Sequence, residues 1–268
     1  MSNGESTDQE VLVCTPRFLP PGKIAAADAI AFETNPDNRP EDFDLGAGAT
    51  GQDRLVVDRR VYWGAKGVRL TVGFLDNPPA DLRAKILSHM NAWNQWANVQ
   101  FVEAQVDPQV RIARADSPPE MSGFWSYLGT DILTIDKEKQ TMNLEGFTMN
   151  TRDSEFFRVV RHETGHTLGF PHEHMRKAII ERLDAEKVIA EFMRTQGWSR
   201  QEVINQVLTP LEKSSVLGSR TADANSIMCY QIAGRLTKDG KPIPGGTDID
   251  AIDSAVAAKL YPKPKTPH

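Results

Sequence analysis

The sequence is poor in cysteine. Its 268 residues include only two, Cys14 and Cys229. Two cysteines exclude a disulfide-dense scaffold of the kind found in small secreted domains. A hydrophobic core must therefore hold the fold, and a chain of this length is long enough to bury a sizeable one.

Membrane and secretion signals are also lacking. No apolar run approaches the roughly 20 residues that cross a bilayer, which excludes membrane insertion by a helix. The first residues, MSNGESTDQEVLVC, do not contain the basic segment followed by an apolar one that marks a secretory signal. We therefore expect either a cytoplasmic protein or export by a route that needs no such signal.

Positive charge is not in excess. The formal net charge is −5, and no cluster of lysine and arginine marks a basic face. Nucleic acid is therefore excluded as a partner. Hydrophobic residues make up 40% of the chain and charged residues 25%, proportions that are typical of a soluble globular protein.

Proline and glycine divide the chain into unequal parts. Five prolines interrupt residues 1–60, and the segment LGAGATG at 45–51 is small and flexible in composition. We expect residues 1–60 to form an extended N-terminal arm that resembles an inhibitory pro-segment. Residues 61–262 are expected to form the main domain, and residues 263–268 a flexible tail.

Periodicity predicts an α+β fold. Strands are predicted where apolar and β-branched residues cluster, at 68–74, 99–104, 110–115, 124–128, 131–136 and 141–144. Helices are predicted by apolar residues at helical spacing, over 80–97, 151–170 and 248–261. A capping box, SRQE at 199–202, opens a further helix. We expect a mixed N-terminal sheet with covering helices, followed by a mostly helical and irregular C-terminal part.

Histidines are concentrated in one stretch, RHETGHTLGFPHEH, which holds four of the six in the chain. His162 and His166 are four residues apart, so a helix places both imidazoles on one face. Gly169 lets the chain leave the helix and bring back His172 as a third ligand. Three neutral nitrogens leave one coordination position open, which is typical of catalytic zinc. The alternative is a helix with incidental surface histidines.

Two more residues complete the expected centre. Glu163 can reach a water on the zinc ion without binding the ion itself, so it is the candidate general base. Met228, within SIMCY at 226–230, is placed to form the methionine turn that lies beneath the zinc in metzincins. Without the zinc motif, such a methionine would be interpreted as core filler.

Four segments together resemble the astacin family of metzincin zinc endopeptidases. They are SGFWSYLG (122–129), HETGHTLGFPHEHMR (162–176), SIMCY (226–230) and DIDAIDSAVAAKLY (248–261). The resemblance runs from about residue 60 to residue 262 in the family's order. It implies a two-lobed metzincin catalytic domain with a cleft, one catalytic Zn²⁺ bound by the three histidines, and hydrolysis of peptide bonds in protein or peptide substrates.

The resemblance also implies roles for single residues. Tyr230 would bind zinc at rest and then swing away to stabilise the oxyanion, for which a phenol is a suitable hydrogen-bond donor. Glu173 would bind the amino terminus of a processed chain. The alternatives are a buried tyrosine with a satisfied hydroxyl and an ordinary salt-bridged or solvated carboxylate. His174 is expected to be structural.

Trp125, Ser126 and Tyr127 correspond by the same resemblance to the edge strand above the family's cleft. Such an edge can pair with the backbone of an extended substrate, which makes these residues candidates for substrate binding. The alternative is that Trp125 and Tyr127 belong to the core. Both interpretations stay open at this point.

The chain departs from the family in its cysteines. Astacins usually carry four in two disulfides, whereas Phe124 stands here where one is expected. The usual pro-segment aspartate motif is not evident either. Cys14 offers a replacement, because a thiolate is a good zinc ligand and VLVCTPR (11–17) could cross the cleft and keep the enzyme a latent zymogen. The alternatives are an inert thiol and a Cys14–Cys229 disulfide.

Two other functions fit the same fold. A peptide-binding module could keep the cleft without the chemistry, although such proteins usually lose the base or a ligand, and this chain retains all of them. A protease exported as an effector or toxin would share the chemistry and differ in where its substrate lies.

Overall fold

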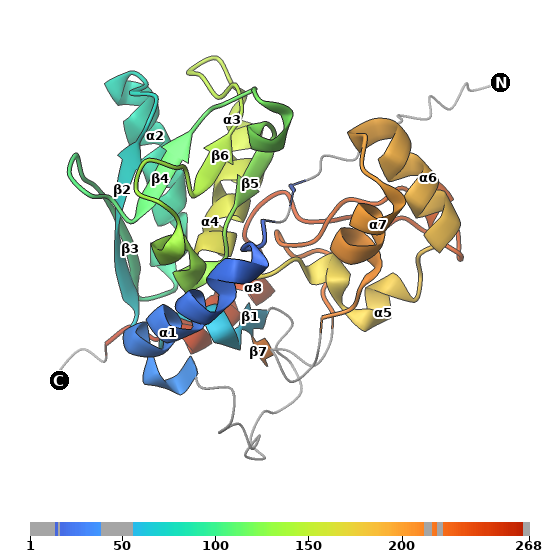
Figure 1. Cartoon of the computed structure of the whole chain (residues 1–268). Coiled ribbons are helices and arrows are strands. Elements are labelled where there is room, and N and C mark those ends of the chain that lie inside the picture. The colour runs from blue at the N-terminus through green and yellow to red at the C-terminus, as the bar shows by residue number, and fades with distance from the viewer. Residues whose placement is uncertain (1–13, 16, 39–55, 212–215, 219–221, 265–268) are drawn as a thin grey trace.

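The chain folds into two lobes, seen on the left and the right of Figure 1. The larger lobe is built on a five-stranded sheet and the smaller one on short helices, and each has its own hydrophobic core. The computed structural model describes residues 14–15, 17–38, 56–211, 216–218 and 222–264.

The sheet of the larger lobe has the strand order β3-β2-β4-β6-β5. Its strands are β2 (Val68–Phe74), β3 (Val99–Glu103), β4 (Val110–Ala113), β5 (Phe124–Ser126) and β6 (Met142–Leu144). The first four in spatial order are parallel, and β5 is antiparallel to β6. The edge that faces the smaller lobe is therefore a short antiparallel strand (Figure 1). A separate antiparallel pair joins β1 (Val56–Asp58) to β7 (Val216–Gly218).

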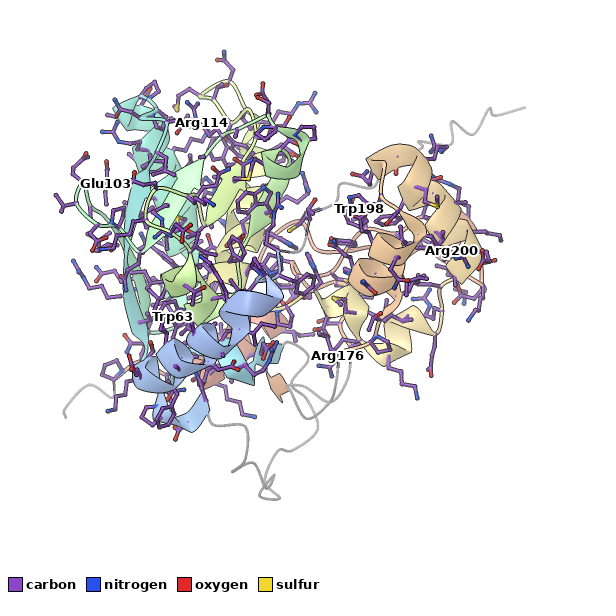
Figure 2. The ribbon with its side chains drawn as sticks, in the orientation of Figure 1. Trp63, Glu103, Arg114, Arg176, Trp198 and Arg200 are labelled. Carbon is purple, nitrogen blue, oxygen red and sulfur yellow. The ribbon has the colours of Figure 1, made fainter. Side chains whose placement is uncertain are left out.

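Helices cover the sheet. The helical elements of the larger lobe include α2 (Ala80–Met90), η4 (Asn91–Gln95), α3 (Asp153–Glu155), the π-helical η7 (Phe156–Val160), α4 (Arg161–Thr167) and α8 (Ala251–Leu260). The apolar stripe of α2 is buried, as predicted. Helix α2 ends at Met90 and not at the predicted residue 97. The side chain of the next residue, Asn91, forms hydrogen bonds with the backbone of Phe101 on β3. Trp63, labelled in Figure 2, is buried and donates from Nε1 to the carbonyl of Thr167 at the end of α4 (2.8 Å).

The smaller lobe is helical, as predicted. It contains α5 (Lys177–Ile180), α6 (Ala185–Gln196), α7 (Arg200–Val203) and the π-helical η9 (Ile204–Leu208). The predicted capping box is present, since the Ser199 side chain accepts from the N–H of Glu202 and the Glu202 side chain accepts from the N–H of Ser199.

Short 3-10 helices occur in other parts of the described chain. They are η1 (Pro21–Lys23), η2 (Pro36–Asn38), η3 (Arg59–Val61), η5 (Pro119–Met121), η8 (Glu173–Met175) and η11 (Gly234–Leu236).

The predicted strand over 131–136 was wrong. The structure has a 3-10 helix there, η6 (Gly129–Thr134). Gly129 adopts φ +43°, and a Cβ at this position would lie 1.9 Å from the carbonyl oxygen of Val61. Close contact with a distant segment therefore turns the chain, and local periodicity carries no signal for such a contact.

The N-terminal arm is not wholly extended, which corrects the prediction for residues 1–60. Residues Ile24–Thr34 form the helix α1, whose alanine-rich sequence favours that conformation. Ala27 and Ala31 are buried, and α1 packs against η6. The ammonium of Lys23 adds a bond to Asp136 (2.9 Å). The arm is thus docked on the larger lobe (Figure 1).

The predicted bounds of the main domain, residues 61 and 262, stay a prediction. The closing helix α8 begins at Ala251 rather than at residue 248, because Asp250 caps its first turn. Most of the predicted tail, residues 265–268, lies outside the described residues, as do residues 39–55 of the arm. No helix in the described part of the chain has the length and apolar character needed to cross a membrane.

Candidate active site

Three histidines converge where α4 meets the loop that follows it. His162 and His166 lie on one face of α4, and both are buried. Gly169 (φ +92°) turns the chain out of the helix, so that His172 faces them. The Nε2 atom of His172 lies 3.2 Å from Nε2 of His162 and 3.1 Å from Nε2 of His166. The three residues that the sequence predicted as ligands are brought together.

Backbone carbonyls fix the tautomer of two of these histidines. Nδ1 of His162 donates to the carbonyl of Ile227 (2.6 Å), and Nδ1 of His166 donates to that of Phe170 (2.7 Å). A proton on Nδ1 leaves the lone pair of Nε2 free to bind a metal. Burial lowers the pKa of His162 to about 4 and keeps the pKa values of His166 and His172 well below the usual range. All three rings are therefore neutral at neutral pH, as ligands must be.

This set of donors fits zinc. The Nε2 atoms of His162 and His166 carry lone pairs, and both lie 3.1–3.2 Å from Nε2 of His172. Tetrahedral coordination with Zn–N distances of about 2.0–2.1 Å puts ligand nitrogens about 3.3 Å apart. The sulfur of Cys14 joins the cluster, in which all four ligand atoms lie within 4.8 Å of one another. The site can therefore take a zinc ion with three nitrogen ligands and one sulfur ligand.

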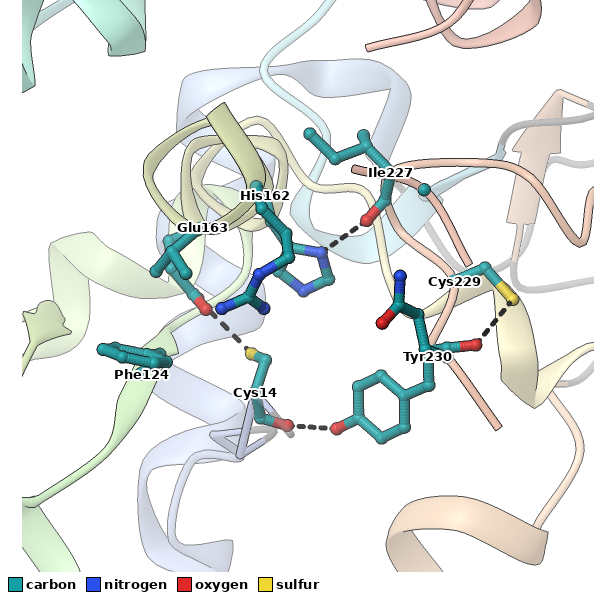
Figure 3. Close-up of a pocket in the computed structure, with 11 residues that line it drawn as sticks. Cys14, Phe124, His162, Glu163, Ile227, Cys229 and Tyr230 are labelled. Atoms are coloured by element: carbon teal, nitrogen blue, oxygen red, sulfur yellow. Dashed lines mark hydrogen bonds between the residues drawn. The ribbon is translucent and has the colours of Figure 1, made fainter. Parts of the chain in front are cut away.

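The arm reaches this site along the edge of the sheet, and Figure 3 shows its Cys14 beside Glu163. Cys14 forms a parallel bridge with Phe124, and Arg17 forms one with Tyr127. The thiol of Cys14 donates to Oε2 of Glu163 (3.4 Å). The segment that carries Cys14 thus lies beside β5 and over the metal cluster, where the sequence interpretation placed it.

The alternative of a Cys14–Cys229 disulfide was wrong. Both cysteines are buried and free. The thiol of Cys229 points to the carbonyl of Tyr230 (3.7 Å), whereas the thiol of Cys14 points to Glu163 (Figure 3).

Glu163 is enclosed next to the first ligand. Its side chain is buried, and its Oε1 atom has no hydrogen-bond partner among the described residues. Burial raises the pKa of Glu163 to about 8, against the hydrogen bond from Cys14 and the charge of Arg158, which lower it. A carboxylate with a free oxygen and a raised pKa is suited to take up a proton and release it again.

The turn at Met228 lies directly against the zinc helix. Met228 is buried, and a Cβ placed on Gly165 would lie 2.5 Å from its sulfur. The turn can approach this closely only because the helix carries no side chain at that position. Met228 therefore occupies the floor of the site, as predicted.

Asp253, at the start of α8, holds this turn, and sequence reasoning missed it. Its carboxylate accepts from the hydroxyl of Ser226 (2.7 Å) and the N–H of Ile227 (2.9 Å). Because the carbonyl of Ile227 accepts from His162, Asp253 positions a zinc ligand through the turn. Burial raises its pKa to about 7. The capping box that Asp253 forms with Asp250 is the sequence feature that could have identified it.

Tyr230 lies over the third ligand. Its ring stacks on His174 with centroids 3.9 Å apart and meets the ring of His172 at 4.5 Å. Its hydroxyl donates to the backbone carbonyl of Cys14 (Figure 3). The arm therefore engages the group that was expected to serve the oxyanion. The role of Tyr230 as a resting zinc ligand stays a prediction.

The edge strand offers its backbone rather than its side chains. Trp125 is 1% exposed and donates from Nε1 to the carbonyl of Met121 (3.2 Å), which supports the core alternative. Ser126 is also buried, with its hydroxyl 3.1 Å from that of Thr167. Tyr127 is half-buried against the core. Substrate binding by these three residues stays a prediction, and pairing with the arm shows that the strand can accept a peptide.

Glu173 is buried rather than solvated. Its Oε1 atom accepts from the N–H of Asp223 (3.1 Å), and its Oε2 atom has no hydrogen-bond partner in the described part of the chain. Burial keeps its pKa well above the usual range. The predicted contact with a processed amino terminus remains a prediction. His174 is buried in the same region, as expected for a structural residue.

Comparison with known proteins decides the family. The sequence model of the Astacin peptidase family matches residues 59–242. The chain belongs to the astacin family. It is 36% identical over 101 residues to zinc metalloproteinase nas-27 of Caenorhabditis elegans, a match that covers 37% of this chain. The chain spans only 20% of the length of that curated relative.

Two solved structures of myroilysin are similar to this astacin. The first is 31% identical with a TM-score of 0.72, and the match covers 78% of this chain and 100% of the other. The second is 30% identical with a TM-score of 0.57, and covers 76% and 86%. These findings confirm the astacin family and the two-lobed α+β metzincin fold. They also confirm zinc as the cofactor and zinc metalloendopeptidase as the enzyme class.

Replacing Asp253 with alanine should weaken the site from a distance. The turn would lose an acceptor for two buried hydrogen bonds, so we expect the free energy of unfolding to fall by about 3 kcal/mol. Zinc affinity should fall by about 10- to 100-fold, because the partner of His162 is no longer held. Urea unfolding and chelator competition measure the two effects. Glu138→Ala, at an exposed carboxylate, is the control and should change neither; unchanged zinc affinity in Asp253→Ala would contradict the positioning role.

The metal-free protein should lose stability as the pH rises from about 6.5 to about 8. Glu163, Asp131 and Asp253 have pKa values near 8, 7 and 7 in the folded chain, all raised chiefly by burial. Over this window the folded chain still holds protons that the unfolded chain has released, so the free energy of unfolding falls. Below about pH 6.5 the buried histidines oppose this effect, because the unfolded chain protonates them and the folded chain does not. Denaturant titrations at successive pH values test this, and stability that rises over the same range would show the opposite linkage.

Proposed function

We propose that this chain is a zinc endopeptidase that its own N-terminal arm holds latent. The observation that carries the proposal is the cluster of four ligand atoms beside Glu163. Three of them belong to the zinc motif, and the fourth is the sulfur of Cys14. A catalytic zinc needs its fourth position for water, and a thiol bound there would exclude that water.

The residues around the cluster have complementary roles in hydrolysis. Zinc, when bound, supplies a Lewis acid that polarises the scissile carbonyl and lowers the pKa of a water. Glu163 takes a proton from that water and passes it to the leaving amine. Tyr230 donates a hydrogen bond to the oxyanion once its hydroxyl is released from the carbonyl of Cys14. The edge strand β5 holds the substrate backbone by strand pairing.

The arm engages all of these groups at once. Its thiol lies among the metal ligands and donates to Glu163, and its carbonyl accepts from Tyr230. The N–H of Thr15 donates to the carbonyl of Phe124 (3.0 Å) and so occupies the edge of the sheet. Displacing this one segment would free the fourth zinc position, the base, the oxyanion donor and the substrate strand together.

The direction of the arm supports latency over self-cleavage. The leaving amine must lie near Glu163, which receives the thiol of Cys14 opposite Phe124. Substrate residues before the scissile bond therefore lie toward Tyr127, and a substrate runs antiparallel to β5. The arm runs parallel to β5. Its peptide bonds are thus presented in the reverse direction.

The other functions have less support. A catalytically silent peptide-binding module does not require the three ligands, the base and the methionine turn, all of which are in place. An exported effector shares the chemistry and differs only in location. Location, whether cytoplasmic or outside the cell by a signal-independent route, stays a prediction that fractionation of the producing cells can test.

Replacing Cys14 with alanine should activate the full-length protein. Casein cleavage is expected to rise at least about tenfold over the wild type, because the arm loses its bond to the metal site. Thr15→Ala is the matched control; it keeps the backbone bond to Phe124 and the thiol, so it should stay as latent as the wild type. Equal cleavage by Cys14→Ala and the wild type would remove the latency proposal.

Adding Glu163→Gln to the activated Cys14→Ala protein should abolish cleavage and preserve metal binding. We expect kcat/KM to fall by about 10²- to 10⁴-fold, since the amide cannot accept the proton of the water. Elemental analysis should still find one zinc per chain. Glu186→Gln, at an exposed carboxylate, should cleave like its parent. A Glu163→Gln protein that keeps full activity would mean that another group is the base.

A further inference from the structure

His174 lies beside the metal site, and the hydrolysis described above gives it no part. It is fully buried in the 3-10 helix η8, two residues after the ligand His172. The rings of His172 and His174 have centroids 5.0 Å apart and planes inclined at 40°. The four ligand atoms of the cluster come from other residues. The role of His174 must therefore be sought in its contacts with other side chains.

The face of the His174 ring is turned to Tyr230. The two rings are stacked, with centroids 3.9 Å apart and planes inclined at 22°. The ring of His172 meets the same phenol at 4.5 Å and at the steeper angle of 61°. Two imidazoles thus bound the phenol, one along its face and one at an angle, and together they limit how its ring can turn.

In this position the phenol carries its hydroxyl to the metal site. The hydroxyl of Tyr230 donates to the backbone carbonyl of Cys14, whose sulfur belongs to the ligand cluster (Figure 3). The hydroxyl lies at the end of a long side chain, so a small rotation of the ring displaces it strongly. Misplacing a catalytic group by about 1 Å can cost about 100-fold in rate. The contact that fixes the ring therefore controls where the hydroxyl donates.

Backbone hydrogen bonds hold η8 itself in place. The N–H of Glu173 donates to the carbonyl of Met228 (2.9 Å), which ties η8 to the methionine turn. The carbonyl of Met175 accepts from the N–H of Leu211 (3.0 Å), and η8 also packs against η9. His174 lies between these two anchors, so its ring is a fixed surface against which the phenol stacks.

We infer that His174 is a positioning residue: its ring stacks on Tyr230 and holds the phenol hydroxyl over the metal site, where the oxyanion forms. Tyr230 keeps its proton and donates a hydrogen bond, and His174 acts only through Tyr230. The inference rests on the proposed function, in which Tyr230 is the oxyanion donor. A histidine that served the core alone would stabilise the lobe without affecting this donor.

The test compares how two peptides of one sequence bind to the zinc-loaded full chain. One peptide carries the ordinary amide, and the other carries in its place a phosphinic group, a tetrahedral anion that resembles the oxyanion. Cys14→Ala releases the arm, and Glu163→Gln prevents cleavage of the amide. The ratio of phosphinic to amide affinity then reports the hydrogen bond from Tyr230, because this bond is made to the anion and not to the ground state.

Three variants assign this ratio to the stacked pair. In His174→Leu the ratio should fall about tenfold while the amide affinity is unchanged. In His174→Phe most of the ratio should remain, because an aromatic face is restored. Tyr230→Phe should lower the ratio by itself, and adding His174→Leu to it should lower the ratio no further, since the two residues act as one unit.

Trp198→Leu is the matched control. Trp198, labelled in Figure 2, packs against Phe192 at the edge of the core cluster that contains Tyr230, with ring centroids 5.6 Å apart. Losing this contact should lower the free energy of unfolding and leave the affinity ratio unchanged.

Several results would overturn the inference. They are an unchanged ratio in His174→Leu, an equal loss in His174→Phe or in Trp198→Leu, a full ratio in Tyr230→Phe, and a further loss when His174→Leu is added to Tyr230→Phe. Each variant that binds zinc decides by itself, so the failure of one to fold leaves the others decisive.

Cleavage by the Cys14→Ala protein with Glu163 intact separates this inference from the proposed function. His174→Leu should lower kcat by about 10- to 100-fold and leave KM unchanged. Cleavage with an unchanged kcat in His174→Leu would overturn the positioning role and leave the protease standing. A tenfold effect of His174→Leu on the affinity ratio, without cleavage of any peptide by any variant, would support the positioning role and contradict the protease.

Discussion

Two hydrogen bonds from histidine rings to backbone carbonyls determine the character of the whole site. The bond from His162 to Ile227 and the bond from His166 to Phe170 put the protons on Nδ1 and turn the Nε2 lone pairs toward His172. Both acceptors lie in turns outside the zinc helix. The position of the metal therefore depends on how those turns pack against the helix.

Small residues and one buried carboxyl group determine how these turns pack against the helix. Gly165 admits the sulfur of Met228 against the helix, Gly169 lets the chain leave it, and Asp253 ties the turn to α8. The N-terminal arm exploits this arrangement, because a single strand on the edge of the sheet reaches the metal ligands, the base and the tyrosine. Under the proposed function, latency and substrate recognition use the same surface, with the peptide in opposite directions.

Much of the site could be predicted from the sequence, because its residues lie close together along the chain. The four-residue spacing of His162 and His166 predicts that both lie on one face of a helix with Glu163 beside them. Gly169 predicts the turn that brings His172 to the same face. Other features depend on contacts between distant segments. The alanine-rich α1 lacks a strong apolar stripe, η6 turns where Gly129 meets Val61, and Asp131 gains its environment from β1 and α1. Trp125 could not be assigned to core or cleft, because alternation on so short a strand does not say which face is inside.

Catalysis requires that the three histidines bind one zinc ion, and latency requires that the thiol of Cys14 bind the same ion in the full-length chain. X-ray absorption at the zinc edge, on protein purified under reducing conditions, tests this directly. We expect three nitrogen ligands at about 2.0 Å and one sulfur at about 2.3 Å, with the sulfur lost in Cys14→Ala. Zinc bound by nitrogen and oxygen alone in the wild type would contradict the arm's role, and the absence of zinc would contradict the site itself.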